Sequence, residues 1–195
     1  MPDKTIEYII SITSRDRIGI VYDISSAISA LNGNITDSRQ SVMCGYYTMI
    51  FRAAFPAKVS RRDIERKLAE VDARSETAIN AVVHAIDMPL LPAADPENHY
   101  VLTATGPDHI GFVATVASFC VEHRINIMDL STTLSDGEFV MILVVDLGCC
   151  PSIRDLRQSL AAFAAEKELK MVLQHHDIFK AVNEISLPIR PTLEK

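Results

Sequence analysis

The feature that most constrains this chain is an internal repeat. Sliding the 195-residue sequence against itself by 92 positions aligns residues 5–87 with residues 97–179 without a gap, and 22 of the 83 aligned pairs are identical. Many of the other pairs exchange one apolar residue for another. A gap-free repeat of this kind predicts two copies of one small domain, each with a hydrophobic core of its own.

The repeat also sets the expected domain boundaries. We expect a first domain at residues 1–87 and a second at residues 97–179. Residues 88–96 contain three prolines, which block regular helix and sheet and predict a semi-rigid linker. Residues 180–195 hold two more prolines and show no second helical face, so we expect a short extension packed on or trailing from the second domain.

Each repeat has the pattern of strand, helix, strand, strand, helix, strand. In the first copy, alternating apolar residues over 6–12 are typical of a strand with one buried face, whereas a spacing of three and four over 21–31 predicts a helix. The remaining expected elements are strands at 35–43, 47–55 and 78–86, a turn at 44–46 and a helix after an N-cap at Ser60. The order βαββαβ predicts an α+β fold: two tandem ferredoxin-like domains, each an antiparallel sheet with both helices on one face.

Composition excludes several classes of function. The formal net charge is -6, and no basic stripe with interleaved aromatic residues is present, which argues against direct nucleic-acid binding. The sequence shows neither a membrane span nor a signal peptide, so we expect no membrane association and a cytoplasmic location. Of the four cysteines, Cys44 and Cys120 fall in apolar patterns and are expected to be core residues. The adjacent Cys149 and Cys150 have poor geometry for a disulfide.

The first candidate site is the segment that joins the first strand of each repeat to its first helix. A glycine without a Cβ lets a ligand or a neighbouring strand approach the backbone, and the free amides of a first helical turn can hold a carboxylate. The alternative is that the aspartates cap their helices and the glycines permit close packing of helix on sheet; for the aspartates we favour the cap. The candidate residues are Asp16, Arg17, Ile18, Gly19 and Ile20 in the first copy, and Asp108, His109, Ile110 and Gly111 in the second.

The second candidate site is the start of the second strand. There the side-chain oxygens of an Asn and an Asp could accept hydrogen bonds from the ammonium of a ligand whose carboxylate the first-helix amides hold. The alternative is that each Asn only adopts a left-handed turn conformation after the helix. The candidate residues are Asn34, Ile35 and Asp37 in the first copy, and Asn126 and Ile127 in the second.

These two segments carry a family resemblance. Each half of the chain resembles an ACT domain, a small βαββαβ regulatory module that binds amino acids. The sequences D-R-I-G-I-V and N-I-T-D-S-R are similar to those of the tandem ACT proteins that repress the glycine cleavage system. Family members commonly have Pro where this chain has Ile18, and agreement is weaker around His109 and Leu130, so the resemblance implies a structural role for the second domain.

The resemblance implies a regulatory function without catalysis. A small amino acid of the glycine or serine type would bind between ACT domains and alter docking to a partner, such as a DNA-binding activator protein. The resemblance also implies a homo-oligomer formed by ACT-domain packing. The alternative is a small enzyme, or an enzyme-accessory protein, linked to folate and one-carbon chemistry, because a related module precedes the catalytic domain of formyltetrahydrofolate deformylase.

The other polar groups give weaker signals. His175, His176 and Asp177 could suggest a metal, but adjacent strand residues point to opposite faces of a sheet, and no further ligand stands at a recognisable spacing. His84 occupies the same repeat position as His176, which favours a shared structural place on the two sheets. No nucleotide-binding or acyl-enzyme motif is present, so we expect no catalytic residues, cofactor or metal.

Overall fold

The structure is a computed structural model that describes residues 5–73, 77–86, 95–135 and 137–183. Contacts divide the chain into two compact units, Met1–Leu91 (unit 1) and Pro92–Lys195 (unit 2). Residues 88–94 of the expected linker lie outside the described residues. Pro96, its last proline, already belongs to a short 3-10 helix, η1 (Pro96–Asn98), which Asp95 caps through the backbone N–H of Glu97.

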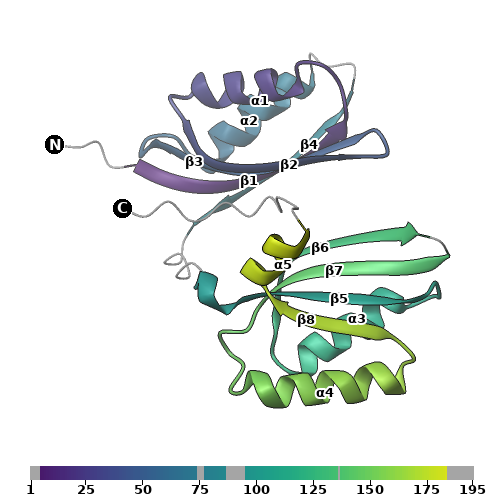
Figure 1. Cartoon of the computed structure of the whole chain (residues 1–195). Helices are drawn as coiled ribbons and strands as arrows, with labels where there is room; N and C mark the ends of the chain where they lie inside the picture. The colour runs from purple at the N-terminus through teal and green to yellow at the C-terminus, as the bar shows by residue number, and fades with distance from the viewer. Residues whose placement is uncertain (1–4, 74–76, 87–94, 136, 184–195) are drawn as a thin grey trace. The chain divides into compact units, whose positions relative to one another are not determined.

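Both units have the same topology, shown in Figure 1. Every strand pair is antiparallel, and the strand orders are β2-β3-β1-β4 and β6-β7-β5-β8. The predicted α+β class with two tandem ferredoxin-like domains is therefore confirmed. Unit 1 comprises β1 (Thr5–Arg15), α1 (Ile20–Ser29), β2 (Asn34–Met43), β3 (Tyr46–Pro56), α2 (Arg61–Asp72) and β4 (Ile79–Ala85). Unit 2 comprises η1, β5 (His99–Pro107), α3 (Phe112–Glu122), β6 (Asn126–Ser135), β7 (Glu138–Asp146), α4 (Ile153–Glu166), β8 (Lys170–His175) and α5 (His176–Asn183).

The core of each unit lies between one face of its sheet and its two repeat helices. In unit 1 the alternating residues of β1 and β3 meet the apolar stripes of α1 and α2. Burying each such side chain stabilises the unit by about 1.5–3 kcal/mol.

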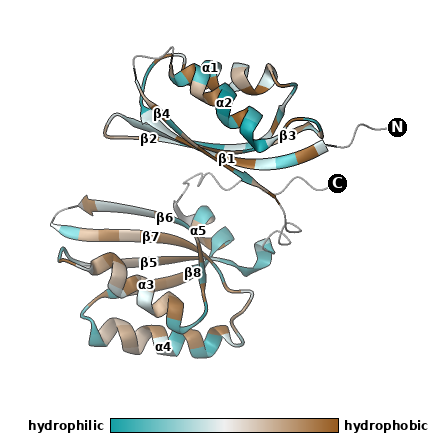
Figure 2. Ribbon diagram, turned by 180° about the vertical axis from the view of Figure 1, so that it is seen from behind, coloured by the Kyte–Doolittle hydropathy of each residue, from teal (hydrophilic) through white to brown (hydrophobic). Residues whose placement is uncertain are grey.

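The helices differ in their exposed residues, and Figure 2 shows that α2 carries more hydrophilic residues than α3. The residues of unit 1 that are buried most completely include Ile10, Ile24, Ile28, Phe51, Phe55, Ile64 and Leu68.

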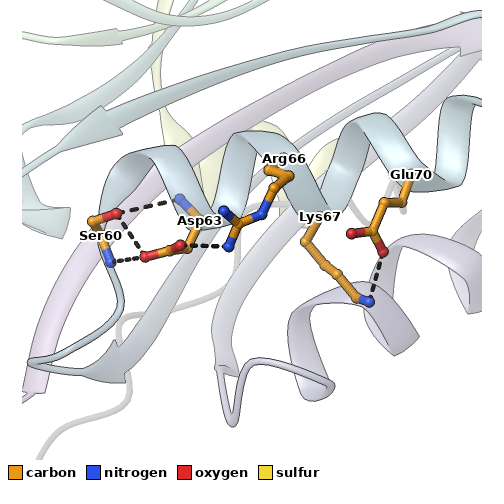
Figure 3. A network of polar contacts seen from close by, with 5 residues as sticks. All are labelled: Ser60, Asp63, Arg66, Lys67 and Glu70. Carbon is orange, nitrogen blue, oxygen red and sulfur yellow. Dashed lines mark hydrogen bonds and ion pairs between the residues drawn. The ribbon is translucent and has the colours of Figure 1, made fainter.

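The helix α2 begins as the sequence predicts. Ser60 accepts a hydrogen bond from the backbone N–H of Asp63, and the Asp63 carboxylate accepts from the backbone N–H of Ser60, so the two form a capping box. The Ser60 hydroxyl also donates to the Asp63 carboxylate (2.6 Å), and this bond together with the one from the Ser60 backbone N–H holds the pKa of Asp63 below its ordinary value. Arg66 pairs with Asp63, and Lys67 pairs with Glu70 one turn further along (Figure 3).

The structure corrects two expectations at the C-terminal end of unit 2. The chain after β8 turns at once into α5, so His176 and Asp177 are helical and not strand residues. The expected extension therefore begins inside a helix, which contacts β5 and β8 on the face of the sheet opposite α3 and α4 (Figure 1). The helix buries His176 and Phe179, which are three residues apart. A single pair at this spacing is too short a pattern to predict a helix from the sequence.

The histidine pair related by the repeat does not share one environment. His84 is exposed on β4, where it pairs with Ile9, whereas His176 is buried in α5. The expectation of a common place on the two sheets is therefore wrong. Burial and the positive charge of Lys180 lower the pKa of His176.

The cysteines divide differently from the sequence expectation. Cys120 is buried in the core, as expected, and its burial raises the pKa of the thiol to about 11. Cys44 is exposed and has a φ of 50°, because it forms a two-residue hairpin turn with Gly45, whose φ is 78°. Positive φ at both residues is what a type I′ turn requires, so the core assignment of Cys44 is wrong. Cys149 and Cys150 are free.

A close contact between the α1–β2 loop and β3 yields the first testable prediction. A Cβ on Gly33 would lie 2.4 Å from Cε1 of Phe55, so we expect Gly33→Ala to lower the free energy of unfolding by about 1–3 kcal/mol. The aligned residues of unit 2 are Ile125 and Leu147, a larger residue facing a smaller one. In a Phe55→Leu background the same substitution should therefore lower stability less, as urea denaturation would measure, although Cγ2 of Ile28, 2.8 Å from the added Cβ, still opposes it. Equal losses in both backgrounds would show that the Phe55 contact is not the constraint.

Candidate functional site

The loop between the first strand and the first helix has the same backbone in both units. Gly19 is the N-cap of α1 with φ 88°, and Gly111 is the N-cap of α3 with φ 92°. These left-handed values favour glycine, because L side chains crowd the backbone there. Neither helix has a side-chain cap. Each helix therefore presents the amides of its first turn without a side-chain acceptor.

The surroundings of these glycines decide between two sequence interpretations. A Cβ at Gly111 would meet nothing within 4 Å, and one at Gly19 would meet only Nη1 of Arg17 at 3.8 Å. Close packing of helix on sheet is therefore wrong as the reason for either glycine. The backbone conformation requires glycine, and the space beside it is open.

The aspartates of the loop do not cap the helices, although capping was the favoured interpretation. Asp16 stands three residues before the N-cap, and its backbone N–H donates to the carbonyl of Gly45 in the β2–β3 turn (2.9 Å). This bond ties the loop to the hairpin end. The carboxylates of Asp16 and Asp108 are exposed and have no ion pair with any residue that the structure describes.

The residues next to these aspartates differ between the units. Arg17 donates to Asp23 of α1 (2.6 Å) and to the carbonyl of Ile18 (3.3 Å), and so holds the loop against the helix. His109 instead places Nδ1 3.0 Å from the carbonyl oxygen of Pro107. Ile18 and Ile110 are fully exposed at the tips of the loops.

Beneath the loop of unit 1 lies a polar pair that sequence reasoning did not single out. Tyr47, 1% exposed, donates from its hydroxyl to Oε1 of Gln40 (3.2 Å), and the sulfur of Met49 is 3.0 Å away. Burial and the negative charge of Asp16 raise the pKa of Tyr47. The repeat could have pointed to this pair, because the residue of the second copy that aligns with Tyr47 is Phe139, which has no hydroxyl.

The structure does not bring the second candidate segment to this loop within one unit. Asn34 pairs with Ala54, whereas the loop leaves β1 after Arg15, which pairs with Tyr46. Eight residues of β3 separate the two levels, about 26 Å at the rise of a strand. Asn34 and the loop therefore lie at opposite ends of the sheet.

The backbone around the second segment also corrects its alternative interpretation. The left-handed residues after the helices are Asn32 and Arg124, both with φ 55°, and Asn34 and Asn126 already begin strands. The register then shifts between Ile35 and Asp37, and in the same way between Ile127 and Asp129. These bulges bend the first residues of β2 and β6 and so change the direction in which their side chains point. Ile35 and Ile127 pack against the cores, while Asp37 pairs with Arg52 in the β2–β3 register.

Metal sites and membrane spans were the other kinds of feature considered from the sequence. The described residues contain no group of three or more His, Cys, Asp or Glu side chains that could hold a metal ion. Among the helices of the same part of the chain, none is long and apolar enough to cross a membrane.

Comparison with known proteins identifies the family. The model of the ACT domain matches residues 7–81 and 98–174, one stretch in each unit. The fold and the two matches define a tandem ACT-domain protein, and the chain belongs to the ACT-domain family, whose members are regulatory modules.

The relatives match one domain length at a time. A UPF0237 protein of Neisseria meningitidis is 36% identical over 91 residues, which cover 45% of this chain and 99% of the relative. A UPF0237 protein of Clostridium perfringens is 31% identical over 86 residues, 44% of this chain and 97% of the relative.

Two solved structures match most of the chain. A protein of unknown function from Galdieria sulphuraria has a TM-score of 0.72 and 23% identity, covering 88% of this chain and 98% of its own. A "putative glycine cleavage system transcriptional repressor" has a TM-score of 0.69 and 15% identity, covering 87% and 96%. At sequence identities this low, the similarity to these two structures shows a shared fold and nothing about function.

The glycine geometry yields a second prediction. Gly19→Ala and Gly111→Ala should each lower the free energy of unfolding by about 1–2 kcal/mol, because alanine is strained at positive φ even where its Cβ has room. Asparagine tolerates this conformation better, so Gly19→Asn and Gly111→Asn should lose less. Denaturant unfolding measures all four. If the alanine variants matched the wild type, the left-handed conformation would not be the reason for glycine.

Proposed function

We propose that this chain is a cytoplasmic amino-acid-sensing regulatory protein without catalytic activity. The observation that carries the proposal is the β1–α1 loop of unit 1. There an uncapped first helical turn, a left-handed glycine with only the Arg17 guanidinium within 4 Å of the missing Cβ, and an exposed Asp16 carboxylate without an ion pair to any described residue occur together.

These groups suit the two charges of an amino acid. The positive end of the α1 dipole and the first-turn amides favour the carboxylate. The Asp16 carboxylate favours the ammonium. The absence of a Cβ at Gly19 lets the ligand approach the backbone. We propose a small effector of the glycine or serine type, with Ile18 of the loop and the backbone of Ile20, the buried first residue of α1, beside it.

The role of Asn34 in this proposal requires a second copy of the chain. β2 is an edge strand of ten residues that contains no proline, and its free edge can pair with another strand. Antiparallel pairing of two β2 strands about their midpoint places Asn34 of one copy opposite Met43 of the other, beside the turn that Asp16 contacts. A homo-oligomer of this kind would bring the amide of Asn34 to the loop of the second copy.

The regulated partner is proposed on two grounds. ACT domains are regulatory modules, and one structure of the same tandem fold carries the name of a transcriptional repressor. With a net charge of -6, the chain itself is poorly suited to hold DNA phosphates. We therefore propose that effector binding changes its docking to a protein, either a DNA-binding activator or a metabolic enzyme.

Calorimetry of the purified full-length chain against the common amino acids tests the proposal. We expect wild type to bind at least one small amino acid. Asp16→Asn should weaken that binding about tenfold or more, since the ammonium loses its charged partner. The matched variant Asp108→Asn serves as the control for the second unit. If no amino acid binds to the wild type, the sensing function is refuted; if Asp16→Asn binds normally, the assigned loop is wrong.

A further inference from the structure

The two units offer an internal comparison at the base of the helix-start loop. In unit 2 this place is filled by three aromatic rings: the ring centroids of His109 and Phe112 lie 5.5 Å apart, and those of Phe112 and Phe139 lie 4.9 Å apart. Phe112 is 2% exposed. The first residue of α3 is thus packed under its own loop by an aromatic stack.

Unit 1 builds the same place from polar contacts. The residues aligned with His109, Phe112 and Phe139 are Arg17, Ile20 and Tyr47. Arg17 forms the ion pair with Asp23, and the Tyr47 hydroxyl donates to Oε1 of Gln40. The residues of unit 2 that align with Asp23 and Gln40 are both threonines, Thr115 and Thr132. Both polar contacts therefore belong to unit 1 alone.

The fold does not require the hydroxyl of Tyr47. Unit 2 forms the same strand order, the same hairpin register and the same bulge with phenylalanine at this position. Burying a hydroxyl requires a hydrogen-bonding partner to offset the loss of water, and Gln40 supplies one beside the weaker acceptor sulfur of Met49. In accepting that bond, Gln40 is held by its carbonyl oxygen and keeps two amide N–H donors for another group.

The location of Gln40 makes those donors available. Tyr47 and Gln40 lie on the helix side of the sheet, but Gln40 is on the edge strand β2 and is exposed. The backbone N–H of Asp16 donates to Gly45 in the β2–β3 turn, and Tyr47 follows that turn by two residues, so the carboxylate proposed for the ammonium and the Gln40 amide lie at the same end of unit 1.

We propose that Gln40, positioned by Tyr47, reads the side chain of the effector, so that unit 1 selects a hydroxyl-bearing amino acid over its apolar isostere. Because both polar contacts occur in unit 1 alone, we assign the effector to unit 1 and expect one effector per chain. This inference rests on the proposed function, because it concerns the effector bound at the same loop.

Isosteric ligand pairs test the selectivity by calorimetry on the full-length chain. Serine should bind about tenfold more tightly than alanine, and threonine about tenfold more tightly than valine, with one site per chain. Gln40→Thr, which copies Thr132, should bring each ratio close to one while alanine affinity stays the same. Tyr47→Phe, which copies Phe139, should reduce the ratio by releasing the Gln40 side chain.

The controls distinguish failure of the proposed selectivity from failure of the sensing function. Thermal melting checks that both variants fold, and Thr132→Ala should leave all ratios unchanged. Wild type that binds amino acids with equal affinity for serine and alanine would overturn the selectivity but not the sensing function. Full selectivity in both Gln40→Thr and Tyr47→Phe would overturn the role of the polar pair. Two sites per chain would overturn the assignment to unit 1, and no binding at all would overturn the sensing function itself.

Discussion

The antiparallel pairing of the two central strands, β1 with β3 and β5 with β7, fixes the position of every other group in each unit. It places Ile10 opposite Phe51 and makes one face of the sheet apolar, and α1 and α2 then cover that face. The same register brings the end of β1 beside the start of β3. For this reason the loop before α1 and the β2–β3 turn lie together, and the bond from Asp16 to Gly45 joins them. The candidate site is thus a consequence of the core.

Much of this fold could be predicted because its signals are periodic. Alternation along β1 and β3, the apolar stripes of the helices and the gap-free repeat each extend over many residues, and all favour the same topology. The capping box at Ser60 could be predicted because it depends on residues three apart. The helix stop around Asn32 and Gly33 is equally local: Asn32 takes the left-handed conformation, and the N–H of Gly33 donates to the carbonyl of Ile28.

The parts that could not be predicted depend on contacts distant in the sequence or on a shift of a few residues. Asp16 resembles a cap in a one-dimensional reading, but α1 begins three residues later than an aspartate cap would require, and Gly19 takes that place. Asn34 is close to the loop in sequence, yet α1 carries the chain back along the sheet before β2 begins. A short helix such as α5 buries too few residues to give a periodic signal, so its turn after His175 went unrecognised.

The repeat supports fold and function in different ways. Identical residues in the two copies, such as Ile18 and Ile110, show which backbone features the domain preserves, but identity at one position does not ensure one environment, as His84 and His176 demonstrate. His176 is the first residue of α5, the centroid of its ring lies 6.4 Å from that of His99, and Nε2 of both is buried without a hydrogen-bond partner among the described residues. The two copies have the same strand register. A position that is polar in one copy and apolar in the other therefore carries a polar group that the fold does not require. Tyr47 is such a position, since the hairpin of unit 2 has the same register and bulge around Phe139, and the topology therefore does not depend on the hydroxyl.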